Sequence, residues 1–268
     1  MLDETIVGFI DILGYKNLVN EHCNNIDTIC SLEDLLRKSS VGLVEKLKQF
    51  PSEEEQIVEE YYQNVLSMVT VRYISDSVLF TLPISKIGFS HPSFTKEDTI
   101  AHCAHLYFGL IANFCTLFIS KTGLVFRGGI SKGQHYESAF NSNGIHNLFI
   151  FSKAYIDAYE LEKKAETPRI VIDDALWLYL NKLSNDSSKH FFNDGDGRKC
   201  FDIYCSLHHD KYSESRLTDI KKRVEANIRK NINKHNELCK LIYFARFHNM
   251  RVRKDKLNFE KLSIGVPQ

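Results

Sequence analysis

Two aspartates are isolated among apolar or small residues, where a carboxylate is least expected. Asp11 interrupts the run of strand-forming residues Thr5–Leu13, and Asp76 lies between two serines. A buried carboxylate is costly unless it is paired or binds a metal ion. Two carboxylates from neighbouring strands suit Mg²⁺ or Mn²⁺, which take one or two protein carboxylates and complete their shell with water and substrate phosphates. The pair therefore predicts a metal site for phosphoryl chemistry.

A simpler interpretation of the same two residues is equally compatible with the composition. In this interpretation Asp11 caps the helix that follows its strand, and Asp76 only provides the geometry of a turn. Composition alone does not separate the two interpretations.

The elements that must position these aspartates are short strands. Thr5–Leu13 is an apolar run closed by Gly14, which is typical of a strand buried on both faces. Val69–Ile74 and Val78–Leu82 are rich in strand formers and predict a β-hairpin with Asp76 at its tip.

Helical spacing of apolar residues predicts the helices between and after these strands. Ser31–Phe50 and Glu53–Met68 read as two helices separated by Pro51. Thr99–Ser120 is apolar nearly all round, as a helix buried in a core would be, and Gly123 marks its end.

The following segments continue the alternation of strands and helices. Val125–Ile130 is predicted to be a strand, Lys153–Lys164 a helix, and Arg169–Ile172 a further core strand. This alternation predicts an α/β fold, arranged as an α+β sandwich.

The last third of the chain is more polar. Ser187–Arg198 is predicted to be a loop and Lys199–Ser206 a strand. Apolar residues at helical spacing from Leu217 to Ile242 predict one long amphipathic helix. We therefore expect a catalytic domain over residues 1–180 and a carboxy-terminal extension over residues 181–268.

The composition narrows the class of protein. Lys plus Arg equals Asp plus Glu, 34 against 34, so no overall basic charge favours nucleic acid or an anionic membrane. Seven scattered cysteines without paired spacing argue against disulfides and structural zinc. The amino terminus is acidic, and no apolar run reaches about 18 residues. We expect a cytoplasmic protein without signal peptide, membrane span or nucleic-acid partner.

Four segments, in this order, carry a resemblance to one enzyme family. They are Phe9–Tyr15 (FIDILGY), Tyr73–Ser77 (YISDS), Arg127–Gly133 (RGGISKG) and Ser152–Glu162 (SKAYIDAYELE), the last followed by Pro168–Ile170. The first resembles the F-x-D-I-x-G-F element of class III adenylate and guanylate cyclases, and the third resembles their R-x-G-I-x-x-G. Four ordered matches over about 175 residues are more specific than any single motif.

Departures from the family pattern point to a subgroup. The transition-state Asn and Arg of the usual cyclases fall on Ile156 and Glu160, and their purine-reading Lys and Asp fall near Arg72 and Phe149. The residues in these motifs instead resemble those of the pyrimidine cyclases of bacterial anti-phage (Pycsar) defence. The closing segment Leu241–Asn249 resembles the same cyclases.

The resemblance implies a set of site residues. Asp11 and Asp76 would be catalytic and hold two Mn²⁺ or Mg²⁺ ions per active site, with the main-chain carbonyl of Ile12 as a further ligand. Backbone N–H groups of residues 13–16 would bind the triphosphate. The nucleotide-binding residues expected are Phe9, Gly14, Tyr15, Arg72, Tyr73 and Arg127. Each of four of these residues has a simpler alternative role. Phe9 would pack in the core, and Arg72 and Tyr73 would be ordinary surface or strand residues. Arg127 would pair with a nearby acid.

The resemblance also implies the reaction and the partners. The expected enzyme is a phosphorus-oxygen lyase that converts UTP to 3′,5′-cyclic UMP and pyrophosphate, with CTP and cyclic CMP as the alternative. Because class III sites are shared between two domains, a homodimer is expected, with each chain contributing to both sites. A separate effector protein would sense the cyclic nucleotide.

Two rival functions follow from other features. Loss of the familiar Asn and Arg suggests a cyclase-like module that binds nucleotide or protein without turnover. The basic residues between Lys221 and Lys234 suggest, more weakly, a nucleic-acid-binding regulator, although such a run is more often a solvated helix face.

Overall fold

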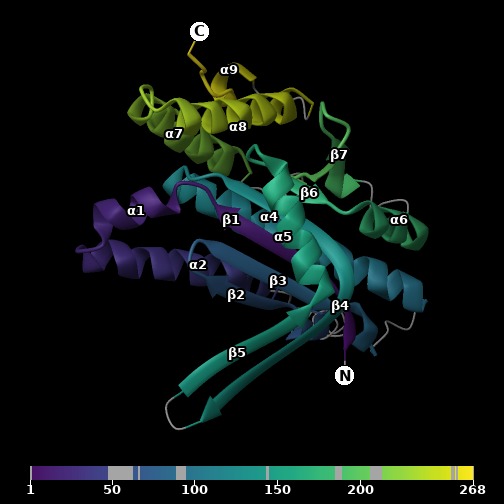
Figure 1. The fold of residues 1–268 in the computed structure, drawn as a ribbon. Coiled ribbons are helices and arrows are strands. Elements are labelled where there is room, and N and C mark those ends of the chain that lie inside the picture. The colour runs from purple at the N-terminus through teal and green to yellow at the C-terminus, as the bar shows by residue number, and fades with distance from the viewer. Residues whose placement is uncertain are drawn as a thin grey trace.

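The computed structural model describes the chain except for residues 1, 48–62, 66, 89–94, 143–144, 185–188, 206–212, 255–256, 258 and 268. Its strands form one eight-stranded sheet, with helices packed on both faces (Figure 1). The predicted mixed α/β architecture is therefore confirmed.

The strand that carries Asp11 is β1 (Asp3–Ile12). It pairs antiparallel with β3 (Ser77–Pro83) on one side and with β4 (Phe126–Ser142) on the other. The sheet order is β2-β3-β1-β4-β6-β8-β7, and β5 pairs with β4 beside this path. The remaining strands are β2 (Thr70–Ile74), β5 (Ile145–Ser152), β6 (Ile170–Ile172), β7 (Phe191–Asn193) and β8 (Lys199–Phe201).

Alternate residues of β1 face two different layers. Ile6 and Ile10 belong to the main core, together with buried residues of α4 (Lys96–Thr122). Val7 and Phe9 point to the opposite side, where they pack with alanines of α5 (Lys153–Ala165). We call this second side the α5 face, and it is the side that carries Asp11, because Asp11 keeps the same two-residue alternation.

The helix α4 forms the centre of the main core. It begins with a capping box at Thr95 and ends at Gly123, whose φ of 72° is the left-handed conformation that favours glycine. This helix is long and apolar enough to cross a membrane, yet 78% of its most apolar window is buried inside the structure. Its apolar character is therefore accounted for by packing.

Shorter helices surround this framework. They are α1 (Tyr15–His22), α2 (Ile26–Leu47), α6 (Asp174–Leu183), α7 (Ser213–Lys230), α8 (His235–Lys254) and α9 (Phe259–Leu262), with the 3₁₀ turn η1 (Ile84–Lys86). The predicted first helix corresponds to α2. The predicted helix Glu53–Met68 falls mostly outside the described residues, although residues 63–65 and 67–68 are helical.

Several sequence predictions need correction. The strand predicted over Val125–Ile130 continues to Ser142 and forms a long hairpin with β5, which the sequence did not predict. The predicted loop Ser187–Arg198 contains β7, and the helix α6 was also not predicted. The single helix predicted over Leu217–Ile242 is two helices, α7 and α8, because the chain turns at residues 231–234.

The carboxy-terminal segment completes the sheet and the core. Strands β7 and β8 extend the sheet beyond β6, and α7 packs along α4. Arg169, next to β6, forms ion pairs with Asp194 and Asp196, and the hydroxyl of Tyr243 from α8 donates to Asp194.

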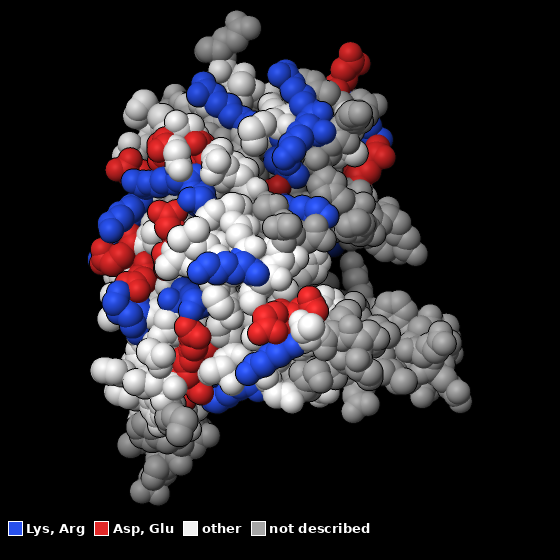
Figure 2. Space-filling view, turned by 90° about the vertical axis from the view of Figure 1, so that its right-hand side faces the viewer, with Lys and Arg blue, Asp and Glu red and all other residues white. Residues whose placement is uncertain are grey.

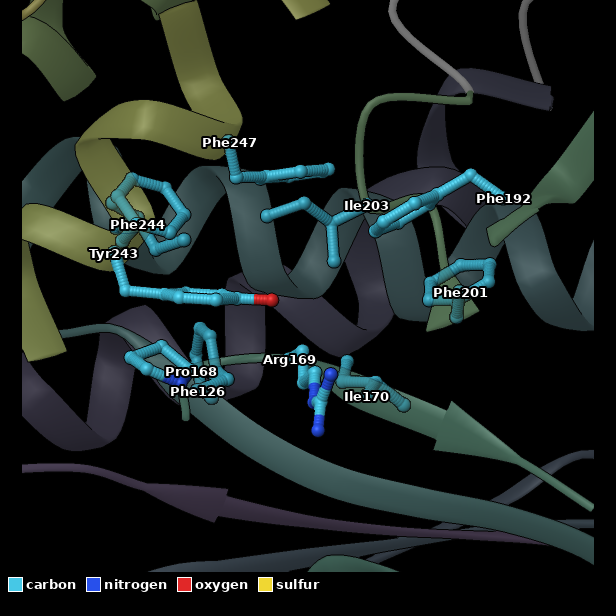
Figure 3. A pocket seen from close by; sticks show the side chains of 11 residues that line it. Phe126, Pro168, Arg169, Ile170, Phe192, Phe201, Ile203, Tyr243, Phe244 and Phe247 are labelled. Atoms are coloured by element: carbon cyan, nitrogen blue, oxygen red, sulfur yellow. The ribbon is translucent and has the colours of Figure 1, made fainter. Parts of the chain in front are cut away.

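An apolar seam separates the sheet from α8 (Figure 3). Side chains from β6, β8 and α8 line it, including Ile170, Phe201, Phe244 and Phe247. The remaining space is about 20 Å³, which has room for about one water molecule. The seam is therefore a packing interface and not a ligand site. On the outer surface that Figure 2 shows, cationic and anionic side chains are interspersed.

Candidate active site

Asp11 and Asp76 lie at the same corner of the sheet. Asp11 is opposite Ser77 in the β1–β3 ladder, and Asp76 lies in the turn between β2 and β3. The N–H of Ile12 donates a 2.7 Å hydrogen bond to the carbonyl oxygen of Asp76. The capping alternative for Asp11 is wrong, because α1 begins after Gly14 and has no side-chain cap. The sequence thus identified two acids that the fold brings together.

Negative charge accumulates around Asp11. Burial, and then the carboxylates of Glu162 and Asp76, raise the pKa of Asp11 from 3.8 to about 6. The charges of Arg127 and Lys240 act in the opposite direction. A site with more carboxylate than cationic charge is one that a bound cation would stabilise.

Arg127 is held by the acid beside it. It lies opposite Asp11 in the β1–β4 ladder, and its Nη2 atom is 3.7 Å from Asp11 Oδ2. The same guanidinium forms a close ion pair with Glu162 of α5, which is only 4% exposed. The structure thus favours the pairing alternative for Arg127 and leaves phosphate contact by this residue as a prediction.

Glu162 was not among the predicted site residues. Its sequence signal was present, because Ala154, Ala158, Glu162 and Ala165 form the buried stripe of α5. A glutamate in a stripe of alanines is costly unless it is paired. Close approach of this helix also explains Gly129 of β4, because a Cβ atom there would lie 2.1 Å from the carbonyl oxygen of Ala158.

The two aspartates are the candidate ligands for Mg²⁺ or Mn²⁺. Within the described part of the chain, no group of three or more His, Cys, Asp or Glu is arranged to hold a metal ion. Asp11 and Asp76 supply the one or two carboxylates that Mg²⁺ usually takes, and this ion leaves its other positions to water and phosphates. The residues fit such a metal when a phosphorylated substrate completes the shell. The carbonyl of Ile12 as a ligand stays a prediction.

A groove of about 430 Å³ opens beside this corner, between the start of α1 and the α7–α8 turn. Gly14 lines it with a φ of 90°, which turns the chain from β1 into α1 and leaves the first N–H groups of the helix without a side-chain partner. The cationic residues of the groove are Lys16, Lys230, Lys234 and Lys240.

The lysines of this groove differ in their partners. Lys230 pairs with Glu21 at 2.6 Å. Within the described residues, Lys16, Lys234 and Lys240 form no ion pair. The groove therefore offers backbone donors and unpaired positive charge, which together suit a phosphate chain.

The aromatic residues predicted for nucleotide binding lie in different environments. Phe9 is buried and meets Tyr155 and Tyr159 of α5 edge to face, at centroid distances of 5.6 and 5.4 Å. Tyr15 packs against the main core and does not line the groove. Nucleotide contact by Phe9 and Tyr15 stays a prediction.

Arg72 and Tyr73 point in opposite directions from β2. Arg72 pairs with Glu137 of β4, at 2.8 Å from Nε to Oε1 and 2.6 Å from Nη2. The hydroxyl of Tyr73 donates a 2.7 Å hydrogen bond to the carbonyl of Leu36 in α2. The two residues therefore do not form one pocket, and neither lies at the Asp11 corner.

The two positions that depart from the cyclase pattern are on the surface of α5. Ile156 is 54% exposed, and Glu160 lies 3.7 Å from Lys163. An apolar side chain and an acid thus stand where the resemblance would have placed an amide and a guanidinium.

Comparisons with known proteins are limited to structure. No family model and no curated protein match the sequence. The similar solved structures include the adenylyl cyclase CyaB from P. aeruginosa, at 17% identity over 68% of this chain and 82% of that chain, with a TM-score of 0.38. They also include the guanylate cyclase domain of RhGC from Catenaria anguillulae in complex with GTP, at 14% identity over 74% and 93%, with a TM-score of 0.40.

A third similar structure is a class III adenylyl cyclase-like ATP-binding protein from Pseudomonas aeruginosa. Its identity is 14%, it covers 77% of this chain and 40% of that chain, and its TM-score is 0.43. Likeness at this level assigns neither an activity nor site residues to this chain.

Proposed function

We propose that this protein is a metal-dependent nucleotidyl cyclase that converts UTP to 3′,5′-cyclic UMP and pyrophosphate. The observation that carries this proposal is the meeting of Asp11 and Asp76 at one corner of the sheet, beside a groove with unpaired lysines. Two acids that can hold Mg²⁺ or Mn²⁺, next to a groove whose donors suit a phosphate chain, support metal-assisted phosphoryl transfer.

The reaction needs little covalent participation by the protein. The ribose 3′ oxygen attacks the α-phosphorus, the bond from that phosphorus to the bridging oxygen breaks, and pyrophosphate leaves while the hydroxyl proton passes to solvent. A bound Mg²⁺ or Mn²⁺ would make the 3′-hydroxyl more acidic and offset the charge of the departing pyrophosphate.

The chain's own residues would bind and orient the triphosphate. The N–H groups at the start of α1 would donate to phosphate oxygens, and Lys16 and Lys240 would neutralise the terminal phosphates. Arg127 would keep Glu162 paired, so that Asp11 remains the carboxylate directed to the site.

The preference for a pyrimidine rests on the sequence resemblance to Pycsar cyclases, with CTP as the alternative substrate. The same resemblance supports a role in anti-phage defence, in which a separate effector senses the cyclic nucleotide. It also supports a cytoplasmic homodimer with shared sites. Exposed apolar side chains on β5 and α5, such as Phe151 at 64% and Ile156 at 54%, support association of two copies.

The test is incubation of the purified protein with UTP, CTP, ATP and GTP in the presence of Mn²⁺, followed by mass spectrometry of the products. We expect one cyclic pyrimidine nucleotide, and none from Asp11→Asn or Asp76→Asn. Asp27→Asn is the matched control, because Asp27 is an exposed aspartate of α2 away from the corner. Equal turnover by Asp11→Asn and the wild type would contradict the proposal.

A second candidate is a nucleotide-binding module without turnover. The observation that favours it is the presence of Ile156 and Glu160 on the exposed surface of α5, where the resemblance would require an Asn and an Arg. The same incubation separates the two functions, because the module would bind a triphosphate and return it unchanged.

A further inference from the structure

A second cavity lies on the α5 face, away from the Asp11 corner. His135 is opposite Asp3 at the far end of β1, and Glu137 lies further along β4. Glu137 nevertheless pairs with Arg72 of β2, which lies beyond β1 and β3 in the sheet order. The outer half of β4 must therefore bend over β1 and β3 towards β2, and Figure 1 shows the β4–β5 hairpin turning away from the sheet there.

This bend encloses about 360 Å³, a volume within the range of about 300 to 1,000 Å³ that is usual for small-molecule sites. The polar side chains of the lining include an ion pair between Lys86 and Asp3, at 2.6 Å. The other polar residues of the lining are Thr5, Thr70, Arg72, Thr81, His135, Tyr136 and Glu137. The hydroxyls of Thr70 and Thr81 are hydrogen-bonded to each other. We call this space the β4 cavity.

Buried polar atoms in the β4 cavity lack partners. His135 is 6% exposed, and neither of its ring nitrogens has a hydrogen-bond partner in the described structure. Glu137 Oε2 also has no hydrogen-bond partner there, and it lies 3.6 Å from His135 Nε2, an ion-pair distance when the imidazole is protonated. Buried groups of this kind are destabilising unless a ligand or water satisfies them. The site is therefore polar, partly enclosed and unsatisfied.

Glu137 is held in its charged form. The nearby His135 and the Arg72 guanidinium keep the pKa of its carboxyl below the usual range, despite the opposing effect of burial. Arg72 engages only Oε1, so Oε2 stays available as an acceptor. Glu137 Oε2 is thus a strong acceptor beside the imidazole of His135 and the hydroxyls of Thr70 and Thr81, each of which can donate or accept. The other carboxylate of the lining, Asp3, is paired with Lys86.

These groups match the polar edge of a pyrimidine. Uracil offers an N–H between two carbonyl oxygens, and cytosine offers an amino group beside a ring nitrogen and a carbonyl. A carboxylate accepts from either kind of N–H, while an imidazole or hydroxyl donates to the carbonyls. Building on the proposed function, we propose that the β4 cavity is the base subsite of this cyclase and that Glu137 and His135 determine its pyrimidine preference.

The subsite must serve the metal corner of a second chain. Val7, Phe9 and Leu79 lie between the two regions on the α5 face, and all are at most 6% exposed beneath α5. A nucleotide cannot cross this packed cluster within one chain. The base held by one copy would therefore belong to a triphosphate bound at Asp11 of the other copy, which agrees with shared sites in a homodimer.

The test is calorimetric binding of 3′-deoxy-UTP, 3′-deoxy-CTP and 3′-deoxy-ATP with Mn²⁺, because analogues without the attacking hydroxyl bind but cannot cyclise. We expect Glu137→Gln to weaken binding of the preferred pyrimidine analogue at least ten-fold, and His135→Asn to change the ratio of UTP to CTP analogue affinities. His190→Asn is the matched control, since His190 is also buried with an unpartnered ring nitrogen but lies by β7, and it should change no affinity by more than two-fold.

The outcomes separate the two proposals. In one outcome the wild type cyclises UTP, and Glu137→Gln and His135→Asn keep the affinity and the base preference of the wild type. This outcome would overturn the base subsite alone. Binding of pyrimidine analogues that is lost in Glu137→Gln, without any cyclisation of UTP or CTP by the wild type, would support the subsite and contradict the proposed function. A wild-type protein that binds none of the analogues overturns both.

Discussion

Asp11 is a carboxylate whose neighbours oppose its ionisation, and this has a consequence for stability. Above pH 6 the folded protein carries a negative charge that burial, Glu162 and Asp76 disfavour, whereas the unfolded chain carries it without penalty. A rise from 3.8 to about 6 corresponds to a cost of about 3 kcal/mol, at about 1.4 kcal/mol per pH unit. The site thus reduces stability in the metal-free protein.

We therefore predict that Asp11→Asn is more stable than the metal-free wild type at pH 7, by up to about 3 kcal/mol. Between pH 6 and pH 4 the wild type takes up the proton in its folded state, so its stability relative to the variant recovers as the pH falls. Urea unfolding at pH 7 and pH 4 with a chelator present measures the difference. A variant that is less stable than the wild type at pH 7 would show that the charge is compensated.

Lys240 is positioned to contact the phosphates of the proposed substrate. It is half-buried in the groove beside α1, forms no ion pair within the described residues, and its charge reaches Asp11. Lys240→Gln should raise KM for the triphosphate about ten-fold, because a charge-assisted contact contributes about 1.5 to 3 kcal/mol. Steady-state kinetics measure it, with exposed Lys182→Gln as the control. An unchanged KM would remove Lys240 from the phosphate site.

The contact of α5 with β4 depends on the absence of a side chain at Gly129. A Cβ atom on Gly129 would lie 2.1 Å from the carbonyl oxygen of Ala158, so Gly129→Ala must displace the helix that carries Glu162. We predict a loss of more than 2 kcal/mol in unfolding free energy and loss of cyclase activity.

Gly109→Ala is the matched control for this substitution. Gly109 lies in α4, and a Cβ atom there meets nothing within 4 Å, so alanine should stabilise the helix by about 0.5 to 1 kcal/mol. Thermal unfolding of both variants tests the pair. Equal stability of Gly129→Ala and the wild type would mean that α5 is not held this closely.

Elements with a periodic apolar pattern were predictable, and those without one were not. The strand β1 and the helix α4 follow directly from their apolar residues. The β4–β5 hairpin was missed because its described outer residues, 136–139 and 147–151, include no buried side chain, so no alternation marks them. The turn between α7 and α8 was missed because helical spacing continues across residues 231–234. The helix α6 had a signal, since the side chain of Asp173 caps it.

The same reasoning separates the parts of the site. Asp11 and Asp76 could be identified because a charge among apolar or small residues is conspicuous. Lys240, His135 and Glu137 could not be identified, because a lysine on an amphipathic helix and a histidine and a glutamate in a polar segment are ordinary residues in the sequence. Each takes its proposed role from distant elements. Their positions depend on the bend of β4 and on the packing of α8, which no local pattern encodes.

The whole molecule is proposed to act as a homodimer, and this can be tested by complementation. Asp11→Asn removes the metal corner and Glu137→Ala removes the base subsite, so each variant alone should be inactive or weak. In a mixed dimer, the intact corner of one chain faces the intact subsite of the other. We predict that equal mixing of the two variants after subunit exchange restores up to about one quarter of wild-type activity, since half of the dimers are mixed and each has one complete site.

Cyclase assays over a range of mixing ratios measure this recovery. A mixture no more active than its components would mean that both groups act within one chain. Asp11→Asn mixed with Asp76→Asn is the control, because each variant breaks the metal corner of its own chain, so no dimer in this mixture has a complete corner and no activity should return.

Two contacts connect the last third of the chain to elements that the ribosome synthesises earlier. They are the ion pairs of Arg169 with Asp194 and Asp196 in the β7–β8 turn, and the packing of α7 along α4. The earlier part of the chain therefore depends on a segment that is synthesised after it. A chain still on the ribosome would have both aspartates but neither the outer strands of the sheet nor the wall of the groove that contains Lys240. The proposed cyclase activity would therefore require that translation has passed α8, because a shorter chain lacks this wall of the groove.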